Sequence, residues 1–550
     1  MTTPSALVND PMAKRLSHLF PSPDEVPPAW RLDPRGYERL YLLDGQVRTW
    51  DGPLAEVSSP ICLRDNGTLK RPVIGQVPSM DEAAALAGLE AAARAWDNGR
   101  GPWPTLGVAA RIDAVEGFVG RMLETRDEVV RLLMWEIGKS LEDSRKEFDR
   151  TVEYIRRTIE ALKDVDRNNS RFSLDDGVIA QVRRAPLGVC LSMGPFNYPL
   201  NETYTTLIPA LIMGNTVVVK PPKFGVLLHQ PLLRAFAESF PPGVVNFIYG
   251  TGSKIIGPIM QSGRIDVLAF IGSSRVADVL KHQHPQPHRM RCVLGLDAKN
   301  PALIMPDADL SVAVRECVTG ALSFNGQRCT GLKILFVHES IADSFLEQLA
   351  TAIRALPVGM PWQPGVKLTP LPEFNKAQSM QAYVEDAVAK GARVVNPDGG
   401  ASCETLYYPA VVYPVVPAAE LYAKEQFGPV VAVCSYRDEQ EFLDFVTRSN
   451  YGQQVSLFGR DHEKMARLID ALVNQVCRVN LNAQCQRGPD TLPFTGRKDS
   501  AEATLSISDA LRCFSIRSLV SAQASAQSRT MIQQIVAGRH STFLHTDFIL

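Results

Sequence analysis

The sequence has no long apolar run and no excess of either charge. None of its apolar stretches approaches the roughly 20 residues that span a bilayer, and "LIPALIMGNTVVV" is interrupted by Gly214 and Asn215. The formal net charge of the 550 residues is −1, which does not indicate nucleic acid or a membrane surface as a partner. The first twenty residues lack a continuous apolar segment and include Asp10, so we predict no secretory signal.

Paired cysteines are also missing. The ten cysteines are scattered, with no CxxC pair and no cysteine–histidine cluster at zinc spacing. We therefore predict no metal site. Unpaired cysteines of this kind are typical of a reducing compartment, and we predict a cytoplasmic protein.

The remaining composition indicates a globular chain with an α/β fold. Apolar residues make up 45% and charged residues 21%, and the length allows two or three domains. Residues 80–163 have the apolar spacing of amphipathic helices. After them, short β-branched strands such as "TVVVKPP", "VLAFIGS" and "KILFVH" alternate with helical segments, which predicts parallel α/β architecture.

Two short motifs contain residues suited to acyl chemistry. Cys329 lies in "FNGQRCTG", beside Arg328 and close to Gly326, and a cysteine thiolate is a strong nucleophile when a base or a cation assists it. Asn197 lies in "GPFNYPLN", where its amide could donate to a developing oxyanion. Taken alone, each motif is better explained by structure: a buried core cysteine and a turn asparagine bonded to its own backbone.

Several motifs in one order change that interpretation. "GPFNYPLNETYTTLIPALIMGNTVVVKPPK", "FIGSSRVADVL", "LGLDAKNPALIMPDADL", "FNGQRCTGLK" and "KEQFGPVVAV" resemble the aldehyde dehydrogenase superfamily over residues 36–520. "NGRGPWP", "GQRCT" and "RGPDTLPFTGRKDS" look most similar to the non-phosphorylating, NADP-dependent glyceraldehyde-3-phosphate dehydrogenases.

The resemblance implies a domain organisation. It gives an N-terminal arm (1–35), a Rossmann-like cofactor-binding domain (36–297), an α/β catalytic domain (298–497) and a C-terminal extension and tail (498–550). A small β extension for oligomerisation would begin at 172–190, in a homodimer or homotetramer. The segment from about Ser500 has little regular pattern of its own.

The resemblance also implies a mechanism. Cys329 would attack an aldehyde, and the resulting oxyanion would lie between the Asn197 amide and the Cys329 backbone N–H. Hydride would pass to nicotinamide, and water would release the acid from the thioester.

The cofactor residues follow from the same match. Lys220 would hold the adenosine ribose, and Lys223 stands where NAD-using relatives often have a glutamate, so we predict NADP, with NAD possible. Gly272 and Ser273 begin a helix, where free N–H groups favour phosphate. Glu425 and Phe427 match residues that contact the nicotinamide ribose.

A phosphorylated aldehyde would need cations, and arginine suits phosphate because its donors form a fork. Arg328, Arg487 and Tyr198 match phosphate-binding residues of the glyceraldehyde-3-phosphate subfamily. Arg150 is a further candidate that could equally be a solvated helix residue.

One expected residue is absent. The family's usual Glu-Leu-Gly-Gly-Lys is Gly295-Leu296-Asp297-Ala298-Lys299 here, so the position of the general base is empty. Asp297 could reach the same water from a new position, with a pKa raised in the pocket. Alternatively, deacylation uses no residue base or a thiol such as coenzyme A, or the protein binds cofactor without efficient turnover. We favour Asp297.

The predicted reaction is oxidation of glyceraldehyde 3-phosphate to 3-phosphoglycerate with NADP and without phosphate incorporation. The alternatives are oxidation of another small aldehyde or semialdehyde, or a cofactor-binding homologue with impaired deacylation. A non-enzymatic binding protein on this fold would have an eroded pocket, which this sequence does not indicate.

Overall fold

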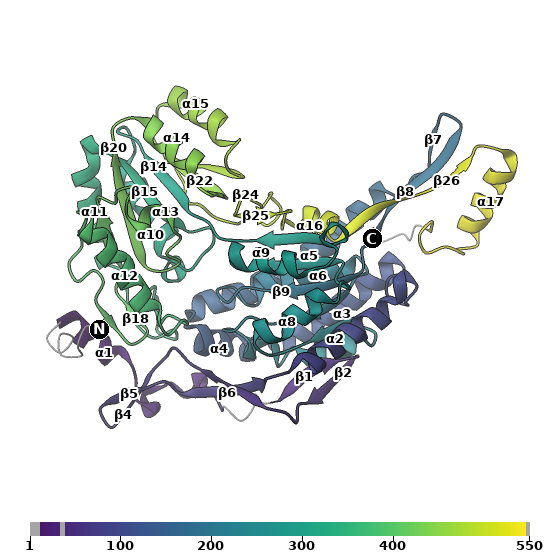
Figure 1. The fold of residues 1–550 in the computed structure, drawn as a ribbon, viewed down its shortest axis with the longest axis horizontal. Helices are drawn as coiled ribbons and strands as arrows, with labels where there is room; N and C mark the ends of the chain where they lie inside the picture. Colours follow the sequence, from purple (N-terminus) through teal and green to yellow (C-terminus); the bar gives the residue numbers. More distant parts are fainter. Residues whose placement is uncertain (1–10, 34–38, 546–550) are drawn as a thin grey trace.

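The computed structural model describes residues 11–33 and 39–545, which form two large sheets with helices around them and a projecting arm (Figure 1). The first sheet has the strand order β2 (Gln46–Thr49), β1 (Leu40–Leu43), β11 (Val245–Phe247), β10 (Thr216–Val219), β9 (Val189–Met193), β12 (Val267–Ile271), β13 (Arg291–Gly295) and β25 (Ala501–Glu502). Its central strands, from β11 to β13, are parallel.

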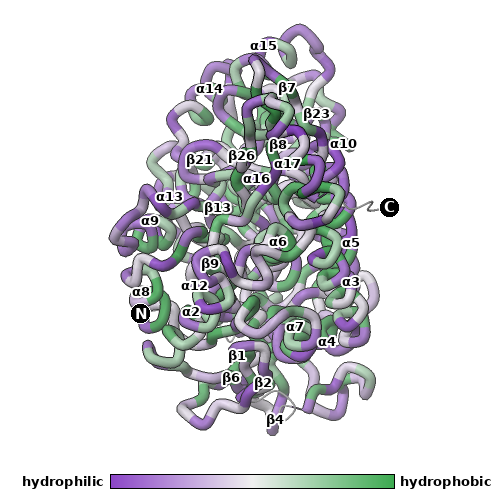
Figure 2. The backbone as a smooth tube through the Cα atoms, turned by 90° about the vertical axis from the view of Figure 1, so that its right-hand side faces the viewer, coloured by the Kyte–Doolittle hydropathy of each residue, from purple (hydrophilic) through white to green (hydrophobic). Residues whose placement is uncertain are grey.

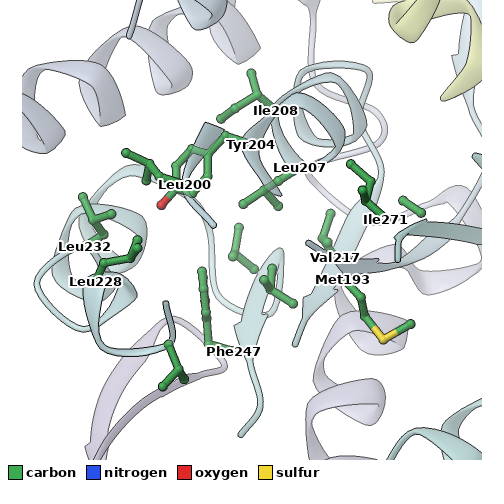
Figure 3. Packing of buried hydrophobic residues seen from close by; sticks show 14 of the residues in the cluster. Met193, Leu200, Tyr204, Leu207, Ile208, Val217, Leu228, Leu232, Phe247 and Ile271 are labelled. Carbon is green, nitrogen blue, oxygen red and sulfur yellow. The ribbon is translucent and has the colours of Figure 1, made fainter. Parts of the chain in front are cut away.

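The parallel strands of the first sheet are mostly apolar because both faces are covered. Every residue of β9, β10 and β12 is buried, as expected for a parallel sheet between helices. Tyr204, Leu207 and Ile208 belong to the same buried cluster as Val217 and Phe247 (Figure 3). The helices around this sheet are α2 (Glu82–Trp96), α3 (Val108–Glu124), α4 (Arg126–Ile137), α5 (Leu141–Asn168), α6 (Asn201–Ile212), α7 (Leu233–Ser239), α8 (Gly252–Gln261) and α9 (Ser274–Gln283).

The second sheet is built from later residues. Its strand order is β16 (Arg393–Val394), β19 (Ala410–Tyr413), β20 (Val430–Tyr436), β15 (Leu332–His338), β14 (Asn300–Ile304), β22 (Gln454–Phe458) and β23 (Arg478–Leu481). It is parallel from β19 to β23. Its helices are α10 (Leu310–Leu322), α11 (Ala342–Arg354), α12 (Lys376–Ala389), α13 (Glu420–Ala423), α14 (Glu439–Arg448) and α15 (His462–Leu472).

The predicted α/β architecture is confirmed by these two sheets. The first takes its strands from residues 40–295 and from β25, and the second takes its strands from residues 300–481. The predicted division at residues 297 and 298 lies between the two sets of strands.

An antiparallel arm projects from the body of the molecule (Figure 1) and points toward the viewer in Figure 2. It contains β7 (Ser173–Asp175), β8 (Val178–Pro186) and β26 (Ser515–Gln523), in the order β26-β8-β7. The helix α16 (Ile507–Cys513) precedes β26, and α17 (Ala526–Ala537) follows it.

Both ends of the chain are more regular than the sequence indicates. The N-terminal arm contains α1 (Pro11–Leu19), which buries Met12, Ala13 and Leu16. The predictions for residues 1–10 and 34–38 lie outside the described residues. The C-terminal segment forms α16, β26 and α17 because β26 pairs with β8, more than 300 positions earlier. Beyond α17, Thr542 donates to the Thr105 carbonyl (2.9 Å) and Arg183 donates to the Phe543 carbonyl (2.8 Å).

Helices long and apolar enough to cross a bilayer are absent from residues 11–33 and 39–545.

Candidate active site

A cavity of about 1010 Å³ opens where the carboxyl ends of the first sheet's parallel strands meet loops of the second sheet. This edge of a parallel sheet is where α/β proteins place their ligands. The loops after β9, β10, β12 and β13 form one wall, and Cys329 and residues 424–427 lie on the other. The predicted site residues that line the cavity are Asn197, Lys220, Lys223, Gly272, Ser273, Asp297, Cys329, Glu425 and Phe427.

Cys329 is half-buried in a strained loop between α10 and β15. The preceding residues Phe324, Asn325 and Gly326 all have positive φ angles, of 48°, 54° and 72°. A Cβ atom on Gly326 would come within 2.6 Å of the Gly428 carbonyl oxygen, so only glycine fits this close approach. The loop thus brings the thiol to the cavity at the expense of backbone strain.

Burial raises the pKa of the Cys329 thiol, and the nearby Glu425 carboxylate raises it further. Lys333 and Arg328 oppose this effect. Lys333 lies on β15, four residues after the cysteine, and its Nζ donates to the Gly326 carbonyl (2.7 Å). The cation therefore anchors the cysteine loop and favours the thiolate.

Asn197 lies beside the cysteine loop, where its side-chain amide can donate to an oxyanion formed by addition of the thiolate. Its amide nitrogen donates to the Gln327 carbonyl (2.8 Å), which holds the side chain against the cysteine loop. The backbone carbonyl of Asn197 accepts a hydrogen bond from the Lys139 ammonium (2.7 Å). Lys139 in turn forms a buried ion pair with Glu147. Within the described chain, the Cys329 backbone N–H has no acceptor. This N–H and the second amide hydrogen of Asn197 are two donors for an oxyanion.

Glu425 lies on the loop between α13 and β20, and its neighbours hold it in place. Its Oε2 accepts from the Ala298 backbone N–H (3.2 Å), and its Oε1 lies 3.6 Å from the Lys333 Nζ. Next to it, the Gln426 amide donates to the carbonyls of Lys333 (2.9 Å) and Val430 (2.7 Å). The loop therefore joins the segment after β13 to β15.

Phe427 contributes an apolar wall to the same loop. Its φ angle is 42°, and its ring lies 5.7 Å from the ring of Phe196 in an edge-on arrangement. The Lys333 ammonium is 4.8 Å from the Phe427 ring centre, a cation–π distance. The cavity thus combines aromatic surface with a few charged groups.

Two lysines on the first-sheet side of the cavity have no carboxylate partner in the described chain. Lys220 follows β10, burial lowers its pKa to about 8, and no described residue provides its ammonium group with a hydrogen bond or an ion pair. Lys223 is exposed, with its Nζ 5.2 Å from the Phe224 ring centre. Both are cations on the cavity wall without a carboxylate partner, which is the charge arrangement that an anionic ligand needs.

The predicted helix N-terminus is present, but its N–H groups are not all free. Gly272 precedes α9, and a Cβ there would come within 2.3 Å of the Phe270 ring. The Ser273 hydroxyl accepts from the Val276 N–H. Asp297 Oδ2 accepts from both the backbone N–H and the hydroxyl of Ser274, each at 2.8 Å. The expectation of free N–H groups is therefore wrong at Ser274, because the helix end already binds a carboxylate.

The predicted substrate arginines are mostly paired with carboxylates. Arg150 makes two hydrogen bonds to Asp490, at 2.9 and 2.6 Å. Arg487 is buried, with one ion pair to Glu202 and another to Asp490 at 3.3 Å. Arg150 also lines a separate cavity along α5. Asp490 and Glu202 thus neutralise two of the three arginines proposed for phosphate.

Arg328 and Tyr198 differ from that pair. Arg328 donates to the Gln484 side chain (3.2 Å), the Thr330 hydroxyl (3.3 Å) and the Cys485 carbonyl (3.4 Å), and it pairs with no carboxylate in the described chain. The Tyr198 ring lies 3.7 Å under the Lys139 ammonium. Of the predicted phosphate arginines, Arg328 alone keeps an uncompensated charge in the described structure.

Sequence reasoning missed Lys333, Asp490 and Glu202. A lysine inside the otherwise apolar strand "LKILFVH" is a usable signal, since a buried lysine needs a partner. The two carboxylates carry no such signal, because their arginine partners lie far away in the sequence.

The comparisons with known proteins agree with this geometry. The model of the aldehyde dehydrogenase family matches residues 66–518. The NADP-dependent glyceraldehyde-3-phosphate dehydrogenase of Streptococcus equinus is 32% identical over 438 residues, which cover 78% of this chain and 88% of the relative. The malonate-semialdehyde dehydrogenase of Listeria monocytogenes is 27% identical over 438 residues, covering 79% of this chain and 88% of the relative.

A solved structure supports the same assignment. The NADP-dependent glyceraldehyde-3-phosphate dehydrogenase of Bacillus halodurans, complexed with NADP, superposes with a TM-score of 0.81 at 28% identity. The match covers 89% of this chain and 100% of that chain. The chain therefore belongs to the aldehyde dehydrogenase family and is an NAD(P)-dependent aldehyde dehydrogenase.

Proposed function

We propose that the protein oxidises glyceraldehyde 3-phosphate to 3-phosphoglycerate with NADP. The observation that carries the cofactor part is the pair Lys220 and Lys223, two cavity cations without carboxylate partners. A cation at position 223 favours the 2′-phosphate of NADP over the free hydroxyl of NAD. Relatives and a solved structure named as NADP-dependent enzymes support the same choice.

The chain's own residues divide the chemistry as follows. The Cys329 thiolate adds to the aldehyde carbon, and the Asn197 amide and the Cys329 N–H donate to the oxyanion. When bound, nicotinamide supplies the hydride acceptor, and Lys220, Lys223, Glu425 and Phe427 would hold the dinucleotide. Water then cleaves the thioester. Asp297 and Glu425 line the cavity and interact electrostatically, and either could take the proton from that water.

Arg328 supports a phosphorylated substrate, because its guanidinium has no carboxylate partner in the described chain. Arg150, Arg487 and Tyr198 would complete the phosphate site only if phosphate displaces their present partners.

A second candidate is an unphosphorylated semialdehyde. It is favoured by the ion pairs of Arg150 and Arg487 with Asp490 and Glu202, which leave less positive charge for a phosphate. The similarity to a malonate-semialdehyde dehydrogenase also favours an unphosphorylated semialdehyde as the substrate.

The test is NADPH formation by the purified protein, without inorganic phosphate or coenzyme A. We expect steady NADPH production from glyceraldehyde 3-phosphate, with kcat/KM at least about 10-fold above that for malonate semialdehyde. The reverse order would select the second candidate. A single burst that resumes only with coenzyme A would indicate thiol-dependent deacylation, and failure with both aldehydes would contradict both candidates.

We also propose that the arm joins subunits of a homodimer or homotetramer. β26 is an edge strand, and Leu519 on it and Leu174 on β7 are each 60% exposed, which is unusual for large apolar side chains on a strand. Light scattering of the protein and of Leu519→Asp should show an oligomer that dissociates in the variant. The ten free cysteines support the cytoplasm as the proposed compartment.

A further inference from the structure

Gly295 leaves the thioester of this enzyme without the expected proton acceptor, and the remaining carboxylates of the cavity are not equivalent. Those that line it are Glu202, Asp297, Glu373 and Glu425. Glu202 pairs with Arg487, and Glu373 pairs with Lys376 at 2.9 Å. A general base needs a lone pair that is free to accept a proton. Glu425 also lies near a cation, but its distance to Lys333 is 3.6 Å, longer than these direct contacts, so the choice is between Asp297 and Glu425.

Asp297 is committed to the helix end. Its Oδ2 accepts from the N–H and the hydroxyl of Ser274, both at 2.8 Å. Both donors belong to the first residue of α9, so they hold this oxygen at the N-terminus of the helix. Both lone pairs of Oδ2 are therefore occupied, which is a disadvantage for a base.

Glu425 has the opposite environment. Its side chain is 8% exposed, and its Oε1 is buried without a hydrogen-bond donor in the described chain. Its Oε2 accepts from the Ala298 N–H (3.2 Å), which attaches it to the segment that lacks the glutamate. Although Lys333 Nζ lies 3.6 Å away, no described donor occupies Oε1, so this buried carboxylate oxygen in the cavity that holds the nucleophile can accept a proton.

The charges around Glu425 suit reversible protonation. Burial raises its pKa, and Lys333 and the Ala298 N–H oppose this rise. Lys299 also lowers the pKa, and Asp297 raises it. Glu425 in turn raises the pKa of Cys329, Tyr383 and Tyr451. These groups come from the segments packed around the loop.

We propose that Glu425 takes the proton from the water that hydrolyses the Cys329 thioester, an inference that rests on the proposed function. Oε1 accepts one proton as the water oxygen bonds to the thioester carbon. The tetrahedral intermediate then collapses, the carbon–Sγ bond breaks, and Cys329 leaves as a thiolate beside Lys333. The product acid and the proton on Glu425 are released to solvent, and no oxidation or reduction occurs in this step.

Acylating Cys329 with an activated ester allows the hydrolysis of the thioester to be measured without an aldehyde and without the cofactor. The protein is treated with p-nitrophenyl acetate and freed of reagent, and loss of the acetyl group from Cys329 is followed by intact mass. We expect Glu425→Gln to retain the acetyl group at least about 100-fold longer than the natural chain, the lower end of general-base effects. Glu420→Gln removes a carboxylate that pairs with Lys424 but does not itself line the cavity, and this variant should deacylate at the natural rate.

The pH dependence of deacylation distinguishes a general base from a residue with a purely structural role. Glu425 must be ionised to accept a proton, so deacylation should rise with pH and level off above the Glu425 pKa. In Glu425→Gln this inflection should disappear. A variant that keeps both the rate and the inflection overturns the proposal, as does an acetyl-enzyme of the natural chain that is no less stable than a simple thioester.

Restoring deacylation with a second carboxylate would show that Glu425→Gln removes a general base and not only a contact to the cofactor. A Cβ at Gly295 would lie 3.5 Å from the Ile271 and Leu505 side chains, an ordinary contact, so a glutamate can be introduced there. We expect Gly295→Glu in the Glu425→Gln background to restore deacylation at least about 10-fold. A stall in Asp297→Asn together with normal deacylation in Glu425→Gln would assign the base to Asp297 instead. Because no aldehyde is used, failure of NADPH formation would contradict the proposed function without affecting this result.

Discussion

The proposed cofactor side and the proposed aldehyde side of Cys329 use their charges in different ways. On the cofactor side, Lys220 and Lys223 have no carboxylate partner in the described chain. On the aldehyde side, Asp490 binds Arg150 and Arg487 together, and Glu202 binds Arg487 as well. The number of cations is therefore a poor guide to anion binding, and the partners that neutralise them decide what remains for a ligand.

This difference makes the two specificities unequal in strength. An anionic dinucleotide meets free charge, whereas a phosphorylated aldehyde must compete with internal carboxylates or rely on Arg328. The cofactor preference should therefore be stronger than the preference for a phosphorylated substrate.

The largest expected effect is at the residue where the two sides meet. Cys329→Ala should reduce NADPH formation by about 10⁴-fold or more, because no covalent intermediate can form. Cys403→Ala is a matched control, since Cys403 is also half-buried but lies on β17 (Ser402–Cys403), outside the cavity. Equal losses in both variants would mean that the thiol effect is structural.

Asn197→Ala should be next in size. Removing one oxyanion donor lowers kcat by about 100- to 1,000-fold, while the dissociation constant for NADP should stay the same. Rapid-mixing absorbance at the first turnover and a cofactor titration measure the two quantities. A rise in KM with unchanged kcat would instead assign Asn197 to ground-state substrate binding.

The free charge of the cofactor side is tested by Lys223→Glu. Loss of a charge-assisted contact and addition of repulsion should weaken NADP binding by about 10- to 100-fold, or about 1.5 to 3 kcal/mol, and leave NAD binding nearly unchanged. Lys254→Glu makes the same charge change at an exposed position of α8 that does not line the cavity. Calorimetric titration with both dinucleotides distinguishes them, and equal weakening of NAD and NADP by Lys223→Glu would contradict a contact with the 2′-phosphate.

The sequence predicts much of this site because its motifs are local. The loop of Cys329, the turn of Asn197 and the strand end of Lys220 each place a side chain through neighbouring residues, and the parallel strands bring these ends to one edge. The α/β fold follows from the same alternation of strands and helices.

The partners of the charged residues could not be predicted. Arg150 and Asp490 are separated by 340 positions, and the Asp297 carboxylate reaches a helix that begins 23 residues earlier. Sequence spacing carries no information about such contacts, because they depend on how the sheets and helices pack. The same limit explains why the sequence pattern does not predict β26.

The smallest expected effect tests the neutralised aldehyde side. Asp490→Asn removes the carboxylate that binds Arg150 and Arg487, and one added unit of net positive charge should lower KM for glyceraldehyde 3-phosphate about fivefold, or about 1 kcal/mol. KM for malonate semialdehyde, which has no phosphate, should change less. Asp149→Asn, whose partner is Arg126, controls for the charge change beside Arg150 on α5. If Asp490→Asn leaves KM for the phosphorylated aldehyde unchanged while kcat is retained, these arginines do not meet a phosphate, and the comparison favours the unphosphorylated semialdehyde.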